Sequence, residues 1–220
     1  MISPVFIFIL FISYVTGSIP TSIIVGKISK NIDIREHGSG NAGGTNVFRV
    51  LGWKPALVVV IVDVFKGWLP TAVYSMYSIN YINMEVAPGV LQILCGFCAV
   101  LGHTYPLFSG FRGGKGVGTI GGMLIALFPI AIPLCLIVFA LTLMFTGYVS
   151  LGSILASSSL PILLSILHKI FPVAEPSISL LIFSLLVPWF VIYTHRSNIA
   201  RLRNGTENQF KKAMIFKNRT

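Results

Sequence analysis

The sequence predicts an all-α membrane protein, a polytopic bundle of seven transmembrane helices with its N-terminus outside and its C-terminus in the cytoplasm. Three observations support this fold class. Of the 220 residues, 55% are hydrophobic and only 10% are charged, whereas an average soluble domain has about 25% charged residues. Long apolar runs recur along the chain without the alternation of polar and apolar residues that β-barrel strands require. Lys and Arg gather in the segments between these runs.

The apolar runs give the order of the helices. They are residues 3–26, 54–78, 87–106, 119–146, 149–168 and 177–194. No basic residue precedes the first run, so we interpret it as the first span and not as a cleaved signal peptide. The fourth run is longer than the roughly 20 residues of one span. It contains Pro129 and Pro133, which break helices, so we expect two short crossings there and seven in all.

The positive charges favour this odd number. The sixteen Lys and Arg residues, apart from Lys66 and Lys169, lie in two loops and in the tail after residue 195. Basic segments stay in the cytoplasm, and an odd number of crossings leaves the uncharged N-terminus outside. The net charge of +10 therefore indicates orientation in a membrane and not a nucleic acid partner. We expect one domain, residues 1–220, whose cytoplasmic segments are the loops at about 27–54, 107–118 and 195–207 and a lipid-attracted basic tail, 208–220.

Two cytoplasmic loops have the composition of anion sites. The first contains 39-SGNAGGTNVFR-49, where glycines allow close backbone approach and Arg49 can hold a phosphate in a bidentate fork. An ordinary Gly- and Asn-rich turn would look the same. The second contains 102-GHTYPLFSGFRGGKGVGT-119, which is not a nucleotide P-loop because Gly116, not Ser or Thr, follows Lys115. A helix that begins near Val117 would still attract an anion. His103 is either part of this site or a structural histidine.

The segment after the last apolar run is 195-HRSNIARLRNGTE-207. His195 and Asn198 share one face if the helix continues, and His195 can act as a base or a hydrogen-bond donor. A basic helix that meets lipid headgroups would explain its arginines equally well. Ser150 and Ser153 join this cytoplasmic face if the chain crosses the membrane seven times.

Two further features lie inside the apolar runs. Asp63 and Lys66 are three residues apart and can pair within one helix, either for function or as a purely structural pair. Cys95 and Cys98 form a C-x-x-C, but no βαβ pattern surrounds it, so a redox site is not expected. Three basic, glycine-bearing segments on one face suit a ligand with more than one phosphate group, or two phosphorylated ligands.

The three motifs resemble those of the bacterial membrane acyl-phosphate:glycerol-3-phosphate acyltransferases, the PlsY family. The family patterns are roughly S-G-N-x-G-x-T-N-x-x-R, G-H-x-x-P-x-F-x-x-F-x-G-G-K-G-V-A-T and H-R-x-N-I-x-R-L-x-x-G-x-E. All three occur here in order, from Ser39 to Arg49, from Gly102 to Thr119 and from His195 to Glu207. Gly44 and Gly118 stand where the family usually has Ala, and neither change removes a functional group.

The resemblance implies a seven-helix bundle in the bacterial cytoplasmic membrane with its active site facing the cytoplasm. It implies transfer of a fatty acyl group from acyl phosphate to the 1-hydroxyl of sn-glycerol 3-phosphate, giving lysophosphatidic acid and phosphate, the first acylation step of phospholipid synthesis. Membrane lipids and a peripheral enzyme that makes acyl phosphate are the further partners it implies. Neither a metal nor another cofactor is expected, because Asp and Glu are too sparse near the motifs for a cation site.

The resemblance also implies roles for individual residues. Arg49 and Lys115 would bind phosphate, and Ser39, His195 and Asn198 would orient glycerol phosphate. Either His195 or a substrate phosphate would take the hydroxyl proton. The residues expected to bind substrate are Asn41, Gly43, Thr45, Asn46, His103, Gly113, Gly114, Gly116, Ser150 and Ser153. Structural roles are expected for Glu207, Asp63 and Lys66.

Two other function classes fit parts of the sequence. An anion transporter would suit the intramembrane Asp63 and Lys66 and the internal prolines, but it should have polar residues along a path through the midplane. Here the polar groups gather on one face. A non-catalytic lipid-binding scaffold would not need the spacing of His195 and Asn198.

Overall fold

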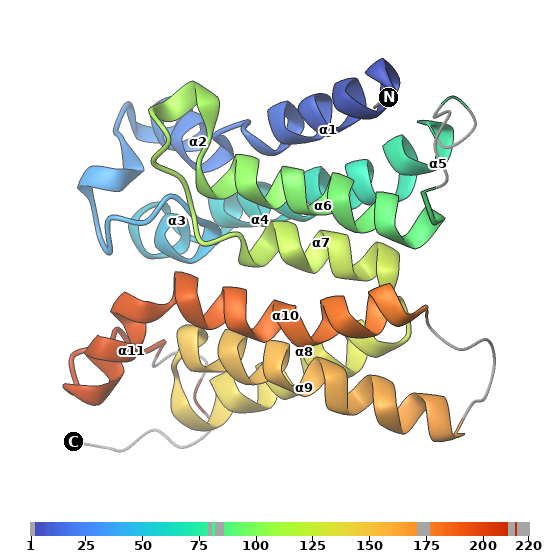
Figure 1. Ribbon diagram of the computed structural model, residues 1–220. Coiled ribbons are helices and arrows are strands. Elements are labelled where there is room, and N and C mark those ends of the chain that lie inside the picture. The colour runs from blue at the N-terminus through green and yellow to red at the C-terminus, as the bar shows by residue number, and fades with distance from the viewer. Residues whose placement is uncertain (1–2, 79–80, 82–85, 171–176, 211–213, 215–220) are drawn as a thin grey trace. The chain divides into compact units, whose positions relative to one another are not determined.

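The computed structural model describes residues 3–78, 81, 86–170, 177–210 and 214. Within these residues every regular element is a helix, as Figure 1 shows. The chain divides into two compact units, residues 1–127 and residues 128–220. The first two predicted motifs lie in the first unit, and the third lies in the second.

The first unit contains the first two motifs. Its elements in chain order are α1 (Pro4–Gly17), α2 (Thr21–Lys30), the short helix η1 (Ile34–Glu36), α3 (Gly44–Leu51), α4 (Trp53–Leu69), the π-helical turn η2 (Pro70–Tyr74), α5 (Ser75–Ser78), α6 (Pro88–Thr104), η4 (Leu107–Ser109) and α7 (Val117–Leu127). The π-helical turn begins at Pro70, which has no N–H to continue the α-helical hydrogen bonds of α4.

Glycines allow the long helices of this unit to pack closely. A Cβ atom at Gly67 of α4 would lie on the Thr119 carbonyl oxygen of α7, and one at Gly122 of α7 would lie on the Val64 carbonyl oxygen of α4. Small residues of this kind bring membrane helices into backbone contact, where dispersion forces stabilise the pair. The same close approach occurs between α1 and α6 at Gly17 and Gly102.

Residues 27–54 have more structure than the loop that the sequence predicts for them. They contain the end of α2, η1 and the whole of α3. Ile34 of η1 and Val47 of α3 are fully buried against Ala56 and Val59 of α4. The apolar residues of α3 face this small core, which fixes the first motif to the start of α4. The helix is too short to stand out as an apolar run, so the sequence pattern did not reveal it.

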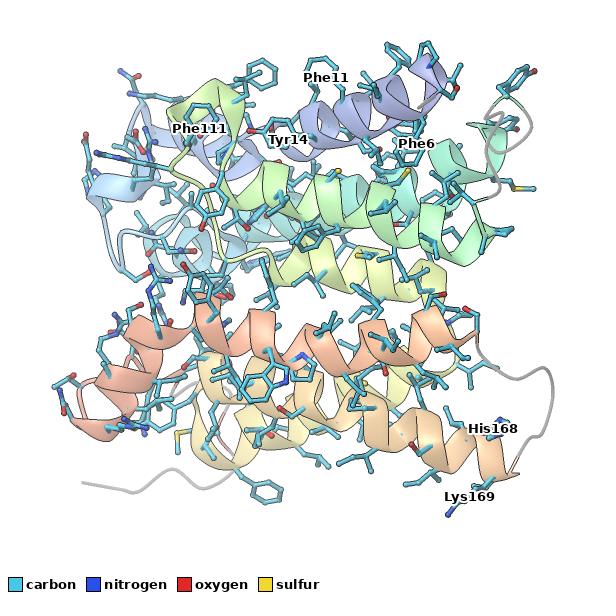
Figure 2. The ribbon with its side chains drawn as sticks, in the orientation of Figure 1. Phe6, Phe11, Tyr14, Phe111, His168 and Lys169 are labelled. Carbon is cyan, nitrogen blue, oxygen red and sulfur yellow. The ribbon has the colours of Figure 1, made fainter. Side chains whose placement is uncertain are left out.

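The second unit contains the third motif. It consists of α8 (Ala131–Thr146), α9 (Val149–Ile170), α10 (Ile178–Thr194) and α11 (Arg196–Arg203). His168 and Lys169 lie at the far end of α9 from Ser150, as Figure 2 shows. The axes of α10 and α11 differ by 63°, so the helix does not continue straight through His195.

Four helical stretches of the described residues are long and apolar enough to cross a membrane: Pro4–Lys30, Trp53–Tyr77, Pro88–Ser109 and Val149–Ile170. The bent pair of α10 and α11 makes a fifth. α7 and α8 are apolar but shorter, and the break between Leu127 and Ala131 confirms the predicted division of the run 119–146. Seven crossings and the orientation of the termini remain predictions.

Candidate active site

The first motif is organised around the side chain of Asn46. This residue lies in the first turn of α3 and is almost fully buried. Its Nδ2 donates to the carbonyl oxygens of Ile34 at 3.0 Å and His37 at 2.9 Å, and its Oδ1 accepts from the Ser39 N–H at 2.8 Å. The amide therefore makes three hydrogen bonds to the loop before α3. In this arrangement Asn46 shapes the loop, and the other polar residues of the motif are the ones that reach its surface.

Those other residues surround the start of α3. Ser39 is exposed, and Asn41, Gly43, Thr45 and Arg49 are half-buried. Gly43 is the residue before the helix and Thr45 lies in its first turn, where N–H groups without helical partners point outward. The loop reaches this point through Gly38 and Gly40, which have φ values of 61° and 71°, a region that favours glycine.

The second motif begins at the end of α6 and folds back on it. The Gly113 N–H donates to the Thr104 carbonyl oxygen at 3.2 Å, and the Gly114 N–H donates to the His103 carbonyl oxygen at 3.1 Å. Gly113, Gly114 and Gly116 are among the residues expected to bind substrate, and this stays a prediction. The N–H groups of Gly113 and Gly114 are used inside the protein. The rest of this surface is the start of α7, with half-buried Lys115 and buried Gly116 directly before Val117.

A buried charged group lies beneath this loop. Lys66 Nζ is 2.9 Å from Asp63 Oδ1 and donates to the Ile19 carbonyl oxygen at 3.0 Å. His103 Nδ1 lies 3.6 Å from the same Asp63 oxygen, which is too long for a hydrogen bond. These side chains line a small pocket. A Cβ atom at Gly114 would lie on His103 Nε2, so the imidazole packs directly against the backbone of the second motif.

Arg35 links the two motif loops, and sequence reasoning did not select it. Its Nη1 donates to the Ser109 carbonyl oxygen at 2.9 Å and to the Arg112 carbonyl oxygen at 3.4 Å. Its Nη2 lies 2.7 Å from Asp33 Oδ2, and the hydrogen bond from Arg35 holds the pKa of Asp33 below its ordinary value. The sequence signal that could have indicated it is the Asp-x-Arg spacing of Asp33 and Arg35.

The third motif is organised around the carboxylate of Glu207. Its Oε1 accepts from Asn198 Nδ2 at 2.6 Å and from Ser150 Oγ at 2.9 Å, and its Oε2 accepts from Arg201 Nε at 2.7 Å. Burial alone would raise the pKa of Glu207, but these hydrogen bonds hold it below its ordinary value of 4.5. The carboxylate therefore stays ionised although the side chain is buried.

The turn at the end of α11 brings Glu207 back against α11. The Gly205 N–H donates to the Leu202 carbonyl oxygen, and the Thr206 N–H donates to the Arg201 carbonyl oxygen. With Gly205 at φ 68°, this is a Schellman motif, a common way for a helix to end. The turn reverses the chain, so that Glu207 lies beside Asn198 and Arg201.

His195 lies at the bend between α10 and α11. It is buried, and its Nδ1 lies 2.8 Å from the Val191 carbonyl oxygen. A carbonyl oxygen only accepts, so Nδ1 must carry a hydrogen. Nε2 is therefore the ring nitrogen that gains or loses a proton, which suits a base or a hydrogen-bond donor.

Each unit thus brings one group of predicted residues together. The first unit joins the first two motifs with Asp63, Lys66 and His103. The second unit joins His195 and Asn198 with Ser150 and Glu207, and Ser153 Oγ donates to the Val149 carbonyl oxygen in the same turn of α9. The group in the first unit contains cations, a hydroxyl and helix starts, which are partners of phosphate.

Several known proteins are similar to this chain in sequence. A glycerol-3-phosphate acyltransferase of Chlorobium chlorochromatii (strain CaD3) is 43% identical over 223 residues, which cover 91% of this chain and 95% of the relative. One from Chlorobaculum tepidum is 42% identical over 222 residues, with 93% and 96% covered.

Two solved structures are also similar. One is the crystal structure of PlsY, an integral membrane glycerol 3-phosphate acyltransferase, in its glycerol 3-phosphate form. It is 33% identical to this chain, with a TM-score of 0.78 over 93% of this chain and 95% of that one. Its lysophosphatidic acid form is 32% identical, with a TM-score of 0.75 over 93% and 94%.

The family assignment follows from these matches. The glycerol-3-phosphate acyltransferase family model matches residues 7–205, a range that contains the first two motifs and nearly all of the third. The relatives match over more than nine-tenths of the chain, so the likeness is not confined to the motifs. The chain belongs to the glycerol-3-phosphate acyltransferase family of integral membrane proteins, of the PlsY type.

Proposed function

We propose that this protein transfers a fatty acyl group from acyl phosphate to the 1-hydroxyl of sn-glycerol 3-phosphate, which gives lysophosphatidic acid and phosphate. The observation that carries the proposal is the match of nearly the whole chain to glycerol-3-phosphate acyltransferases. The two similar PlsY structures are described as glycerol 3-phosphate and lysophosphatidic acid forms, which are the proposed acceptor and product. Acyl phosphate as donor rests on the likeness of the motifs to those of the PlsY family.

The chemistry needs positioned charges and no covalent acyl-enzyme. Acyl phosphate is a mixed anhydride with a good leaving group. In the proposed step the glycerol 1-hydroxyl oxygen attacks the acyl carbon, the bond between the acyl carbon and the phosphate oxygen breaks, and phosphate leaves. The hydroxyl proton passes to His195 Nε2 or to a substrate phosphate. Holding two reactants in a suitable geometry contributes up to roughly 7–11 kcal/mol to catalysis.

Individual roles follow from the chemistry of the side chains. Arg49 and Lys115 bind the phosphate groups, and Ser39, His195 and Asn198 orient glycerol phosphate. Asn46 and Glu207 act by fixing the first and third motifs. The headgroup of acyl phosphate uses Thr45 and the amides around Gly116, and the remaining proposed contacts are Asn41, Gly43, His103, Ser150 and Ser153.

We also propose seven crossings, with the N-terminus outside and the three motifs in the cytoplasm, in the bacterial cytoplasmic membrane. Lys169 lies at the end of α9 opposite Ser150, so a spanning α9 would put it outside. A peripheral enzyme that supplies acyl phosphate is a further proposed partner. Cysteines introduced at Lys169 and at Arg203 should react with an impermeant thiol reagent from opposite sides of the membrane, and labelling from one side would refute this topology.

The first experiment is an assay of purified, detergent-solubilised protein. Labelled glycerol 3-phosphate is supplied with palmitoyl phosphate and, separately, with palmitoyl-CoA, in the presence of a chelator. Lysophosphatidic acid from palmitoyl phosphate alone is the expected result. Product from the thioester alone would leave an acyltransferase with a different donor. A folded protein that makes no product with either donor would refute the proposed reaction and favour an anion transporter.

A further inference from the structure

The part of the second motif that follows α6 is a short segment, Pro106–Arg112, which we call the strap. It contains η4 and then Gly110 and Phe111, which have φ values of 66° and 58°. Phe111 and Asn31 are the described residues other than glycine with a positive φ. A bulky residue rarely adopts this conformation unless the surrounding structure holds it there. Packing of the Phe111 side chain contributes little to holding this conformation, because the residue is 57% exposed.

Hydrogen bonds at both ends of the turn hold the strap. Within the strap, the Phe111 N–H donates to the Pro106 carbonyl oxygen at 3.0 Å. From outside the strap, Arg35 Nη1 donates to the carbonyl oxygens of Ser109 and Arg112, on either side of the strained pair. Arg35 lies 74 residues before Ser109 in the sequence. One guanidinium therefore holds a turn that its own residues do not favour.

Asp33 determines how the guanidinium is directed. Its carboxylate accepts from the Arg35 backbone N–H at 2.9 Å, from Nε at 3.1 Å and from Nη2 at 2.7 Å. These contacts occupy one edge of the guanidinium and leave Nη1 for the strap. The charge of Arg35 is balanced at the same time, so this arginine is used for attachment within the protein. Lysine has no planar fork that could bind the carboxylate and the two carbonyl oxygens together.

The contact of Arg35 with the strap joins the loops of the first and second motifs. Arg35 belongs to η1, and Asn46 holds the carbonyl oxygens of Ile34 and His37 on either side of it. The strap leads directly through Gly113 and Gly114 to Lys115. A shift of the strap would therefore move Lys115 relative to the first motif, and a displacement of about 1 Å in an active site can reduce the rate about a hundredfold.

We propose that Arg35, directed by Asp33, is a positioning residue of the proposed acyl transfer: it holds the strap so that Lys115 keeps its place relative to the first motif. The inference depends on the proposed function for its effect on catalysis. Whether Arg35 holds the strap can be measured separately, without substrate. Arg35 does not bind substrate in this proposal, which separates it from Arg49 and Lys115.

The test compares R35A, R35K and D33N with K30A as the control. Lys30 is an exposed cation at the end of α2, so K30A removes a surface positive charge that has no proposed role. Hydrogen exchange of the strap backbone, followed by mass spectrometry in detergent, reports its attachment. In R35A and R35K we expect the strap amides to exchange about tenfold faster, and kcat/KM to fall about ten- to hundredfold. K30A should behave like the unmodified protein.

Rescue distinguishes positioning from a general loss of structure. Millimolar guanidinium should restore part of the activity of R35A, because the small cation can bind Asp33 and the strap carbonyl oxygens, and it should not affect K30A. Unchanged exchange in R35A, or faster exchange with kcat/KM within about twofold of the unmodified protein, would overturn the proposal. If R35A does not fold, hydrogen exchange of the strap and kcat/KM are measured on D33N instead, and the same outcomes support or overturn the proposal. If the unmodified protein makes no product, the proposed function fails, and the exchange experiment still decides whether Arg35 holds the strap.

Discussion

Asn198 donates from Nδ2 to Glu207 Oε1 at 2.6 Å, and this contact determines which way its side-chain amide faces. An ionised carboxylate only accepts hydrogen bonds, so the nitrogen of the amide must point to Glu207. The side-chain oxygen of Asn198, Oδ1, is therefore the amide atom that does not face Glu207. Two residues of one motif, nine positions apart, are thus coupled through a turn whose sequence, Asn-Gly-Thr, is typical of a helix end.

E207Q should therefore reduce activity although Glu207 does not react. The new side chain can present its own NH₂ to Asn198, which allows the Asn198 amide to flip, and it loses the ion pair with Arg201. We expect kcat/KM for glycerol 3-phosphate to fall about ten- to hundredfold. E36Q removes an exposed carboxylate and serves as the control. Equal activity of E207Q and E36Q would show that Glu207 does not orient Asn198.

The low pKa of Glu207 predicts a loss of stability in acid. Hydrogen bonds hold the pKa of Glu207 below 4.5 in the folded protein, so the ionised group adds stability at neutral pH, and this contribution is lost as the pH falls through the folded-state pKa. The melting temperature in detergent should fall below about pH 4.5. It should fall less steeply in E207Q, and equal slopes for the two proteins would contradict the prediction.

Two asparagines of the first motif should separate structure from binding. N46A leaves the Ile34 and His37 carbonyl oxygens without their donor and should cost about 1–3 kcal/mol of stability, together with activity. N41A removes a half-buried side chain at the loop surface and should reduce activity with little change in melting temperature. Thermal unfolding and assays of both variants provide the check, and the opposite pattern would exchange the two roles.

K115A and R49A should lose activity while the protein still inserts in the membrane. Each variant removes a cation that is proposed to bind phosphate, and the loss of one well-placed group that stabilises developing charge reduces the rate about 10²–10³-fold. Turnover with saturating glycerol 3-phosphate and palmitoyl phosphate measures the effect. K30A again removes a charge without a proposed role, and near-normal turnover in K115A and R49A would remove both residues from the mechanism.

Much of this organisation could be predicted from the sequence. The apolar runs and the break before Ala131 follow from composition and proline positions, and the pairing of Asp63 with Lys66 follows from their spacing on one helix. The contact of Arg35 with Ser109 could not be predicted, because it joins positions 74 residues apart that only the folded chain brings together. For the same reason the sequence of the second motif did not reveal that the N–H groups of Gly113 and Gly114 are used within the protein.

Neighbouring glycines of α7 test whether close helix packing stabilises the first unit. A Cβ atom at Gly121 has no heavy atom within 4 Å, whereas one at Gly122 would lie on the Val64 carbonyl oxygen of α4. G121A should therefore stabilise the protein by about 0.5–1 kcal/mol, because alanine loses less backbone entropy in a helix. G122A should force α7 away from α4 and cost about 1–3 kcal/mol.

Both variants make the same chemical change in adjacent positions of one helix, so helix propensity cancels in the comparison and packing remains. Melting temperatures in one detergent give the difference directly. G122A should also reduce activity, because Lys115 and Gly116 lie at the start of the helix that is displaced. If G121A and G122A melt at the same temperature, α4 and α7 are not in backbone contact, and the packing of the helix that follows the second motif would have to be explained by other residues.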